Sequence, residues 1–227
     1  MNCNSSLRKI QRIGRKASAR LAAFRQAWRE SDDLPHHRCI DIFLSLTRSS
    51  LILDSSANKD TSSIDLGCGH RPRNPFKAEQ CYGIDIRTVT SADKTVIRKA
   101  NLAVEPIPFE SSSVNFITAF DFVEHIPRAM IIDGKNRFCF VELMNEIYRV
   151  LSTQGIFLSV TPAVPHKSAF TDPTHVNFIT SETFPRYFCN NITGFPSAAS
   201  YGFSGEGFDC IAQGWVGGHL ATLLQKP

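Results

Sequence analysis

The sequence predicts an α/β fold: a Rossmann-like, mostly parallel sheet that ends in an antiparallel hairpin, preceded by an N-terminal helical extension. Three observations support it. From residue 63 onward, short apolar runs alternate with loops and helix patterns, a glycine turn follows the first run, and Gly217-Gly218 separates two extended runs near the end. Strands that alternate with helices typically form a parallel sheet covered on both faces. We therefore expect an extension at 1–58 and one α/β domain at 59–227.

The extension begins with an amphipathic helix pattern. Apolar residues recur at steps of three and four, at Leu7, Ile10, Ile13, Ala17, Leu21, Phe24 and Trp28. Residues 1–29 also hold eight basic residues and no acid. Three interpretations stay open: packing on the domain or on a second copy, contact of residues 5–29 with an anionic membrane surface, and an organellar transit peptide. A second short helix is expected at 38–54.

Composition narrows the class of protein. The chain has 25 basic and 21 acidic residues, and outside 1–29 the basic residues fall to 17, so the main body is mildly acidic. A nucleic-acid partner is therefore not expected. The seven cysteines form no C-x-x-C pair, unlike a disulfide framework or a zinc site. We expect a cytoplasmic protein, with peripheral membrane contact as an alternative, and predict no oligomeric state.

The elements of the main domain follow from periodicity. Apolar runs predict strands at 63–66, 82–86, 114–120 and 156–160. Residues 136–151 predict a helix, because five apolar residues share one face: Phe140, Leu143, Met144, Ile147 and Val150. The runs 208–216 and 219–224, joined by Gly217-Gly218, predict the hairpin.

The most informative motif is the glycine turn after the first strand, Asp65-Leu66-Gly67-Cys68-Gly69. Glycines there allow positive φ and close approach of a ligand. Asp85, at the end of the next strand, can accept hydrogen bonds from ribose hydroxyls. Both features fit a nicotinamide dinucleotide or S-adenosylmethionine. A dinucleotide site needs a third glycine where Pro72 stands, whereas Asp65 suits a cationic amino group, so S-adenosylmethionine is favoured.

Five segments in order resemble the class I S-adenosylmethionine-dependent methyltransferases, particularly the type 11 group, over residues 62–227. They are 65–69, 83–86, 101–109, 120–126 and 146–155. The resemblance implies a Rossmann-like enzyme whose cofactor contacts Asp65, Gly67, Gly69, Asp85, Ile86, Asn101, Leu102 and Phe120. The chain departs from the family pattern at Arg71 and Pro72, where a small residue is usual, and at Asn101 and Asn115, where an acid is usual.

Residues 161–184 are expected on the acceptor side. Their His166 and Asp172-Pro173-Thr174-His175 resemble a segment of methyltransferases found with bacterial polysaccharide-synthesis enzymes, which implies a hydroxyl of a sugar or lipid-linked saccharide as acceptor. Such a hydroxyl needs a base. The candidates are His175, which is preferred, then His125 and His166, with Asp121 or Asp172 to orient one of them.

No metal site is predicted, because the spacing of His166, Asp172 and His175 matches no common ligand pattern. Two other functions stay open. One is methylation of a small metabolite, a quinone or RNA, and the other is a non-catalytic role as a cofactor-binding partner.

Overall fold

The computed structural model describes residues 60–91, 95–192 and 194–227. The helices predicted within 1–58, including the surface expected to contact a membrane at 5–29, lie outside the described residues. Among the described helices, none has the length and apolar character needed to cross a bilayer.

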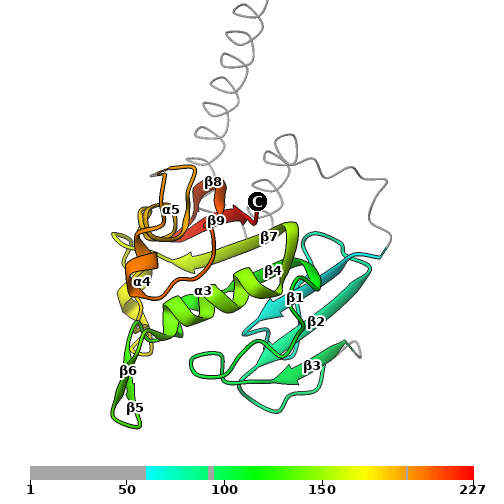
Figure 1. Ribbon diagram of the computed structural model, residues 1–227. Coiled ribbons are helices and arrows are strands. Elements are labelled where there is room, and N and C mark those ends of the chain that lie inside the picture. The colour runs from blue at the N-terminus through cyan, green and yellow to red at the C-terminus, as the bar shows by residue number, and fades with distance from the viewer. Residues whose placement is uncertain (1–59, 92–94, 193) are drawn as a thin grey trace, which may run out of the picture.

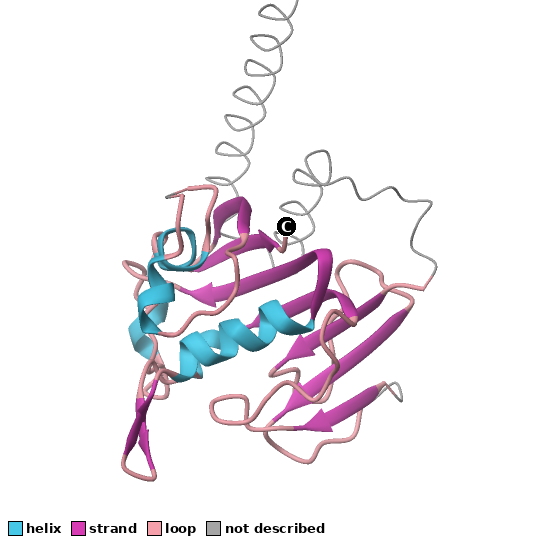
Figure 2. Cartoon of the chain, viewed as in Figure 1, coloured by secondary structure: helices cyan, strands magenta, loops and turns pink. Residues whose placement is uncertain are grey.

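The described residues form one seven-stranded sheet (Figures 1 and 2). Its strands are β1 (Ser62–Leu66), β2 (Gln80–Asp85), β3 (Val96–Lys99), β4 (Val114–Phe120), β7 (Leu151–Pro162), β8 (Asp209–Val216) and β9 (His219–Gln225). They lie in the order β3-β2-β1-β4-β7-β9-β8. β3, β2, β1, β4 and β7 are parallel, and β9 runs antiparallel to both β7 and β8. The predicted α/β fold, with its terminal antiparallel hairpin, is confirmed.

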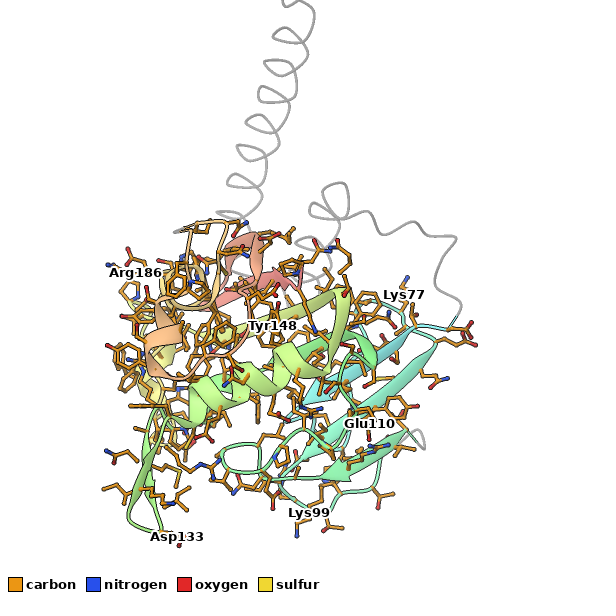
Figure 3. The ribbon with its side chains drawn as sticks, in the orientation of Figure 1. Lys77, Lys99, Glu110, Asp133, Tyr148 and Arg186 are labelled. Atoms are coloured by element: carbon orange, nitrogen blue, oxygen red, sulfur yellow. The ribbon has the colours of Figure 1, made fainter. Side chains whose placement is uncertain are left out.

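Several short elements surround this sheet. The helices are α3 (Cys139–Val150), α4 (Ser168–Thr171) and α5 (Thr183–Phe188), with 3-10 turns η1 (Val123–His125) and η2 (Ser197–Tyr201). A separate hairpin joins β5 (Met130–Ile132) to β6 (Lys135–Arg137) through Asp133, which is labelled in Figure 3. The helix predicted at 136–151 starts at 139 because the residues before it pair as β6, an element that the sequence analysis did not predict.

Apolar clusters cover both faces of the sheet. On one face, Met144 and Ile147 of α3 pack with Ile117 of β4. On the other face, Phe76 stacks on Phe116, with ring centroids 4.6 Å apart. Phe76 belongs to the β1–β2 connection, residues 67–79, which is a loop and not a helix. Pro72 and Pro75 lack the backbone N–H that a helix interior requires, so an apolar loop takes the place of a helix there.

Helix α3 also anchors the end of the chain. Tyr148, labelled in Figure 3, lies edge-on to Phe208 with ring centroids 5.1 Å apart, and the Lys226 ammonium lies 4.8 Å from the Tyr148 ring centroid.

The connections reverse direction between β1 and β4, because β2 and β3 lie on one side and β7 on the other. Ligands of open α/β sheets bind at the carboxyl ends of strands at such a point.

Candidate functional site

The glycine loop is held at the carboxyl end of β1 by the neighbouring strand. The N–H groups of Gly67 and Cys68 donate to the carbonyl oxygen of Ile84, at 2.8 and 3.2 Å. Gly67 has φ +66°, and a β-carbon there would lie 2.4 Å from Cδ2 of Phe122. Only glycine satisfies both constraints, so this loop is fixed against β2 and against the turn that follows β4.

Asp65 accepts a hydrogen bond from the connection that continues the glycine loop. Its carboxylate is buried, Oδ1 accepts from the hydroxyl of Thr118 at 2.7 Å, and Oδ2 accepts from the Arg73 N–H at 2.8 Å. Burial raises the pKa of Asp65 to about 6. A nearby cationic group would favour the ionised carboxylate.

Asp85 ends β2 beside the same loop. Its Oδ2 accepts from the Gly69 N–H at 2.9 Å, and Oδ1 accepts from both the backbone N–H and Nε of Arg87 at 2.9 Å. Hydrogen bonds from the Arg87 side chain hold the pKa of Asp85 below its ordinary value. The Arg87 side chain is 65% exposed, so it can leave for solvent and free Asp85 for ribose hydroxyls. The next residue, Ile86, is exposed.

The remaining predicted cofactor residues lie in two places. Oδ1 of Asn101 accepts from the Ala103 N–H at 3.2 Å, so Asn101 stabilises a turn, and Leu102 beside it is buried. Phe120 ends β4 and is buried, and the Arg73 guanidinium lies 4.5 Å from its ring centroid.

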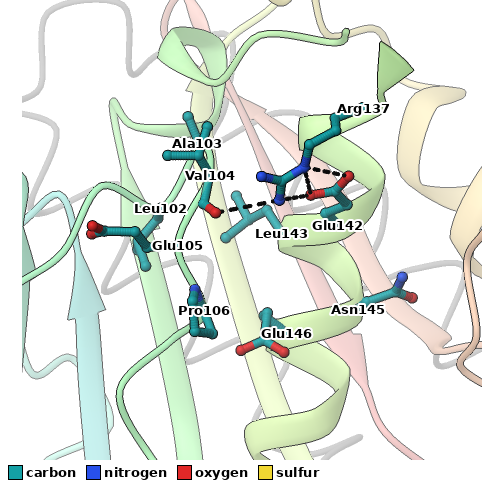
Figure 4. A pocket seen from close by; sticks show the side chains of 10 residues that line it. All are labelled: Leu102, Ala103, Val104, Glu105, Pro106, Arg137, Glu142, Leu143, Asn145 and Glu146. Atoms are coloured by element: carbon teal, nitrogen blue, oxygen red, sulfur yellow. Dashed lines mark hydrogen bonds and ion pairs between the residues drawn. The ribbon is translucent and has the colours of Figure 1, made fainter. Parts of the chain in front are cut away.

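A cleft of about 270 Å³ opens beside Leu102 (Figure 4). It runs between the 102–106 segment and α3, and the Arg137–Glu142 ion pair and Glu146 lie along its wall. Neither Asp65 nor Asp85 lines it. Of the predicted cofactor residues, the cleft is lined by Leu102.

The structure brings two of the three candidate histidines together. His125 ends η1, just after β4, and His175 lies in the loop after α4; their ring centroids are 5.0 Å apart. His166 is placed differently. Its Nδ1 pairs with the Ser168 hydroxyl at 2.8 Å, and that hydroxyl donates to the carbonyl oxygen of Gly218 at the hairpin tip.

The orienting role expected for Asp172 is not observed. Oδ2 of Asp172 lies 4.0 Å from Nε2 of His175, too far for a hydrogen bond. Nδ1 of His175 instead faces the carbonyl oxygen of Ala169 at 3.2 Å. Asp172 accepts from the N–H and hydroxyl of Thr174 at 2.8 and 2.6 Å, because it caps its own turn.

Asp121 has a partner that sequence reasoning missed. Nε2 of His219, the first residue of β9, pairs with Oδ1 of Asp121 at 2.7 Å. Asp121 follows β4 directly with φ +49°, a conformation uncommon outside glycine and often found at functional sites. The end of the predicted strand at 120 indicated the place of Asp121, but no sequence pattern indicates a partner 98 residues away.

Glu124 is a residue to which the sequence analysis assigned no role. It is 1% exposed, and its Oε2 accepts from the Thr161 hydroxyl at the end of β7, at 2.7 Å. Its Oε1 is buried without a hydrogen-bond partner in the described part of the chain. A buried carboxylate therefore lies next to the paired histidines.

Comparison with known proteins gives the fold. No family model matches the sequence, and no curated protein matches it either. Among solved structures, the [4+2]-cyclase SpnF is 13% identical with a TM-score of 0.52, over 82% of this chain and 80% of that one. A SAM-dependent methyltransferase from Archaeoglobus fulgidus is 14% identical with a TM-score of 0.47, over 91% and 99% of the two chains. The YcgJ protein of Bacillus subtilis is 18% identical with a TM-score of 0.39, over 60% of this chain and 64% of that one.

At these identities the comparisons show the fold alone. It is a Rossmann-like α/β fold, which the chain shares with the [4+2]-cyclase SpnF. One fold carries many activities, as the cyclase illustrates, so the function has to be argued from the residues of the site.

Proposed function

We propose that this chain is an S-adenosylmethionine-dependent methyltransferase whose acceptor is a hydroxyl of a sugar or lipid-linked saccharide. One observation supports S-adenosylmethionine as the cofactor. The carboxylate of Asp85, the N–H of Gly69 and the buried acid Asp65 converge at the carboxyl ends of β1 and β2, beside the switch point of the sheet. This arrangement offers oxygen acceptors for a ribose and an anionic environment for an amino group.

Different residues at this edge are proposed to bind different parts of the cofactor. Asp85 would accept from the ribose hydroxyls once the Arg87 guanidinium has turned to solvent, and Asp65 would balance the amino group of the methionine part. Asn101 and Leu102 would border the adenine. Bound S-adenosylmethionine supplies a methyl group on a positively charged sulfur, and the protein has to hold the acceptor oxygen in line with it.

The acceptor assignment rests on the second group of residues. Glu124 and His125 follow β4, His175 packs against His125, and the strand order places the end of β4 next to that of β1. Imidazole and carboxylate groups suit an acceptor that has to lose a proton, as a hydroxyl does. The resemblance of residues 161–184 to methyltransferases found with polysaccharide-synthesis enzymes supports a saccharide over the small metabolite, quinone and RNA alternatives.

The test combines binding with turnover. Calorimetry should show that the full chain binds S-adenosylmethionine and that Asp85→Ala loses roughly 1.5 to 3 kcal/mol, about tenfold or more in affinity. Asp133→Ala, at the tip of the β5–β6 hairpin, is the matched control and should bind normally. Mass spectrometry of free and lipid-linked saccharides should show gain of one methyl group. Binding without turnover on any acceptor class would instead support a non-catalytic partner.

A further inference from the structure

Three potential metal ligands gather on the acceptor side. Each of Glu124, His125 and His175 offers one ligand atom, and these atoms lie within 4.8 Å of one another. The loop that carries His175 is fastened to η1, because the N–H groups of Val176 and Asn177 both donate to the carbonyl oxygen of Glu124 at 2.9 Å. The grouping is therefore held by the backbone and does not depend on chance positions of surface side chains.

One oxygen of the buried Glu124 carboxylate has no hydrogen-bond partner among the described residues. Thr161 satisfies Oε2, whereas Oε1 is buried with no hydrogen-bond partner among the described residues. Leaving such a charged oxygen without a partner is costly. A cation beside Oε1 would compensate the buried charge.

The hydrogen bonds fix the tautomer of His125. The Thr174 hydroxyl donates its only proton to Oδ1 of Asp172 at 2.6 Å, so toward Nδ1 of His125, at 3.1 Å, it can only accept. Nδ1 of His125 also faces the carbonyl oxygen of Thr174 at 3.3 Å. The proton therefore lies on Nδ1, which leaves the Nε2 lone pair available.

His175 has the same arrangement, with its Nδ1 facing the carbonyl oxygen of Ala169 at 3.2 Å. Its imidazole is 8% exposed. Histidines that bind metals typically donate their second ring N–H to a carbonyl or carboxylate, which orients the ring and raises the basicity of the ligating nitrogen. Both histidines thus have the outer hydrogen bonds of metal ligands.

We propose that Glu124, His125 and His175 bind one divalent first-row transition-metal ion from the series that runs from Mn²⁺ to Zn²⁺. Two imidazoles and one carboxylate suit these ions, whereas Mg²⁺ and Ca²⁺ prefer oxygen ligands alone. Three protein ligands leave coordination positions open, as in catalytic metal sites. This assignment replaces the expectation of no metal site and differs from the His166, Asp172 and His175 set, because Asp172 is engaged by Thr174.

The role of the ion rests on the proposed function. An acceptor hydroxyl in an open coordination position would have a lowered pKa. Its proton would pass to water, the oxygen would form a bond to the methyl carbon, and the carbon–sulfur bond would break with its electron pair on sulfur, leaving a neutral thioether. A vicinal pair of hydroxyls, as in a sugar, could occupy two positions at once.

The experiment measures metal binding without cofactor or acceptor. Full-length protein stripped with a chelator is titrated with MnCl₂ and, separately, ZnCl₂ by calorimetry. One ion per chain is expected. Glu124→Gln and His175→Ala should each weaken binding by at least about tenfold, whereas His166→Ala, the matched histidine outside the cluster, should bind like the wild type. Circular dichroism checks folding, and His125→Ala provides a third variant should Glu124→Gln unfold.

The outcomes separate this site from the proposed activity. No stoichiometric binding of either ion, or binding that survives all three cluster variants, would overturn the metal site. Metal binding that depends on these residues supports the site even if S-adenosylmethionine does not bind, in which case only the proposed function fails.

Discussion

The two halves of the candidate site differ in how they are held. On the side proposed to bind the cofactor, Gly69 contacts Asp85 across 16 residues of sequence, and each oxygen of both acids accepts at least one hydrogen bond from the protein. On the side proposed to bind the acceptor, His125 meets the Thr174 turn across 49 residues, and one oxygen of Glu124 has no hydrogen-bond partner among the described residues. The carboxylates of the first half are therefore satisfied by the protein's own donors, whereas the second half keeps one buried acceptor unsatisfied among the described residues.

The largest effect is expected at the acceptor side. His175→Ala should lower kcat by roughly 10² to 10⁴ while leaving S-adenosylmethionine affinity nearly intact, whether His175 removes the proton itself or holds a metal that acidifies the hydroxyl. Steady-state kinetics and calorimetry on the same preparation check this. Testing His125→Ala and His166→Ala in parallel ranks the three candidates. Near-normal turnover in all three would remove histidine from the reaction.

A backbone variant tests how rigid the cofactor side is. Gly67→Ala combines a positive φ with a β-carbon 2.4 Å from Phe122, whereas Gly134→Ala has positive φ and no atom within 4 Å. We expect the free energy of unfolding to fall by roughly 2 to 5 kcal/mol in Gly67→Ala and by roughly 1 to 2 kcal/mol in Gly134→Ala. Urea denaturation measures both. Equal losses of unfolding free energy in the two variants would mean that the Phe122 side chain moves aside at little cost.

Asp65 should make stability depend on pH. Its folded pKa of about 6 lies above the ordinary 3.8. The stability that this group contributes is therefore fully present below about pH 4 and is lost as the pH rises toward 6, by ~3 kcal/mol. Asp65→Asn lacks this titration, so its unfolding free energy should gain on the wild type between pH 4 and 7. Parallel pH profiles of the two proteins would show that Asp65 is not perturbed.

The smallest effect is expected at Arg87. Because its guanidinium occupies the Asp85 oxygens proposed to bind the ribose, Arg87→Ala should tighten S-adenosylmethionine binding by about two- to fivefold, the range of an exposed ion pair. Arg186→Ala, which removes an exposed ion pair with Glu182, is the matched control and should leave the affinity unchanged. Weaker binding in Arg87→Ala would mean that Arg87 positions Asp85 for the ligand.

Local pattern predicted much of the fold. The run 114–120 coincides with β4, and the Gly217-Gly218 turn lies between β8 and β9 as expected. β3 was missed, because Val96–Lys99 is only four residues long and three of them are exposed, so the strand has no apolar run to show. Residues 67–79 form no helix, because Pro72 and Pro75 disfavour one. At this connection the regular alternation of strand and helix is therefore interrupted.

What the sequence determined by itself is the set of residues whose roles depend on near neighbours. Gly67 has a positive φ that favours glycine, and Asp65 and Asp85 lie at the loop because Asp65 is the penultimate residue of β1 and Asp85 ends β2. Only the tertiary structure decided the partners of Glu124, His125 and Asp121. Their contacts with Thr161, His175 and His219 arise when β7, the loop after α4 and β9 reach the end of β4. Periodicity reports which face of an element is apolar, whereas a hydrogen bond between distant segments depends on the register of strands and the course of loops, which no local pattern encodes.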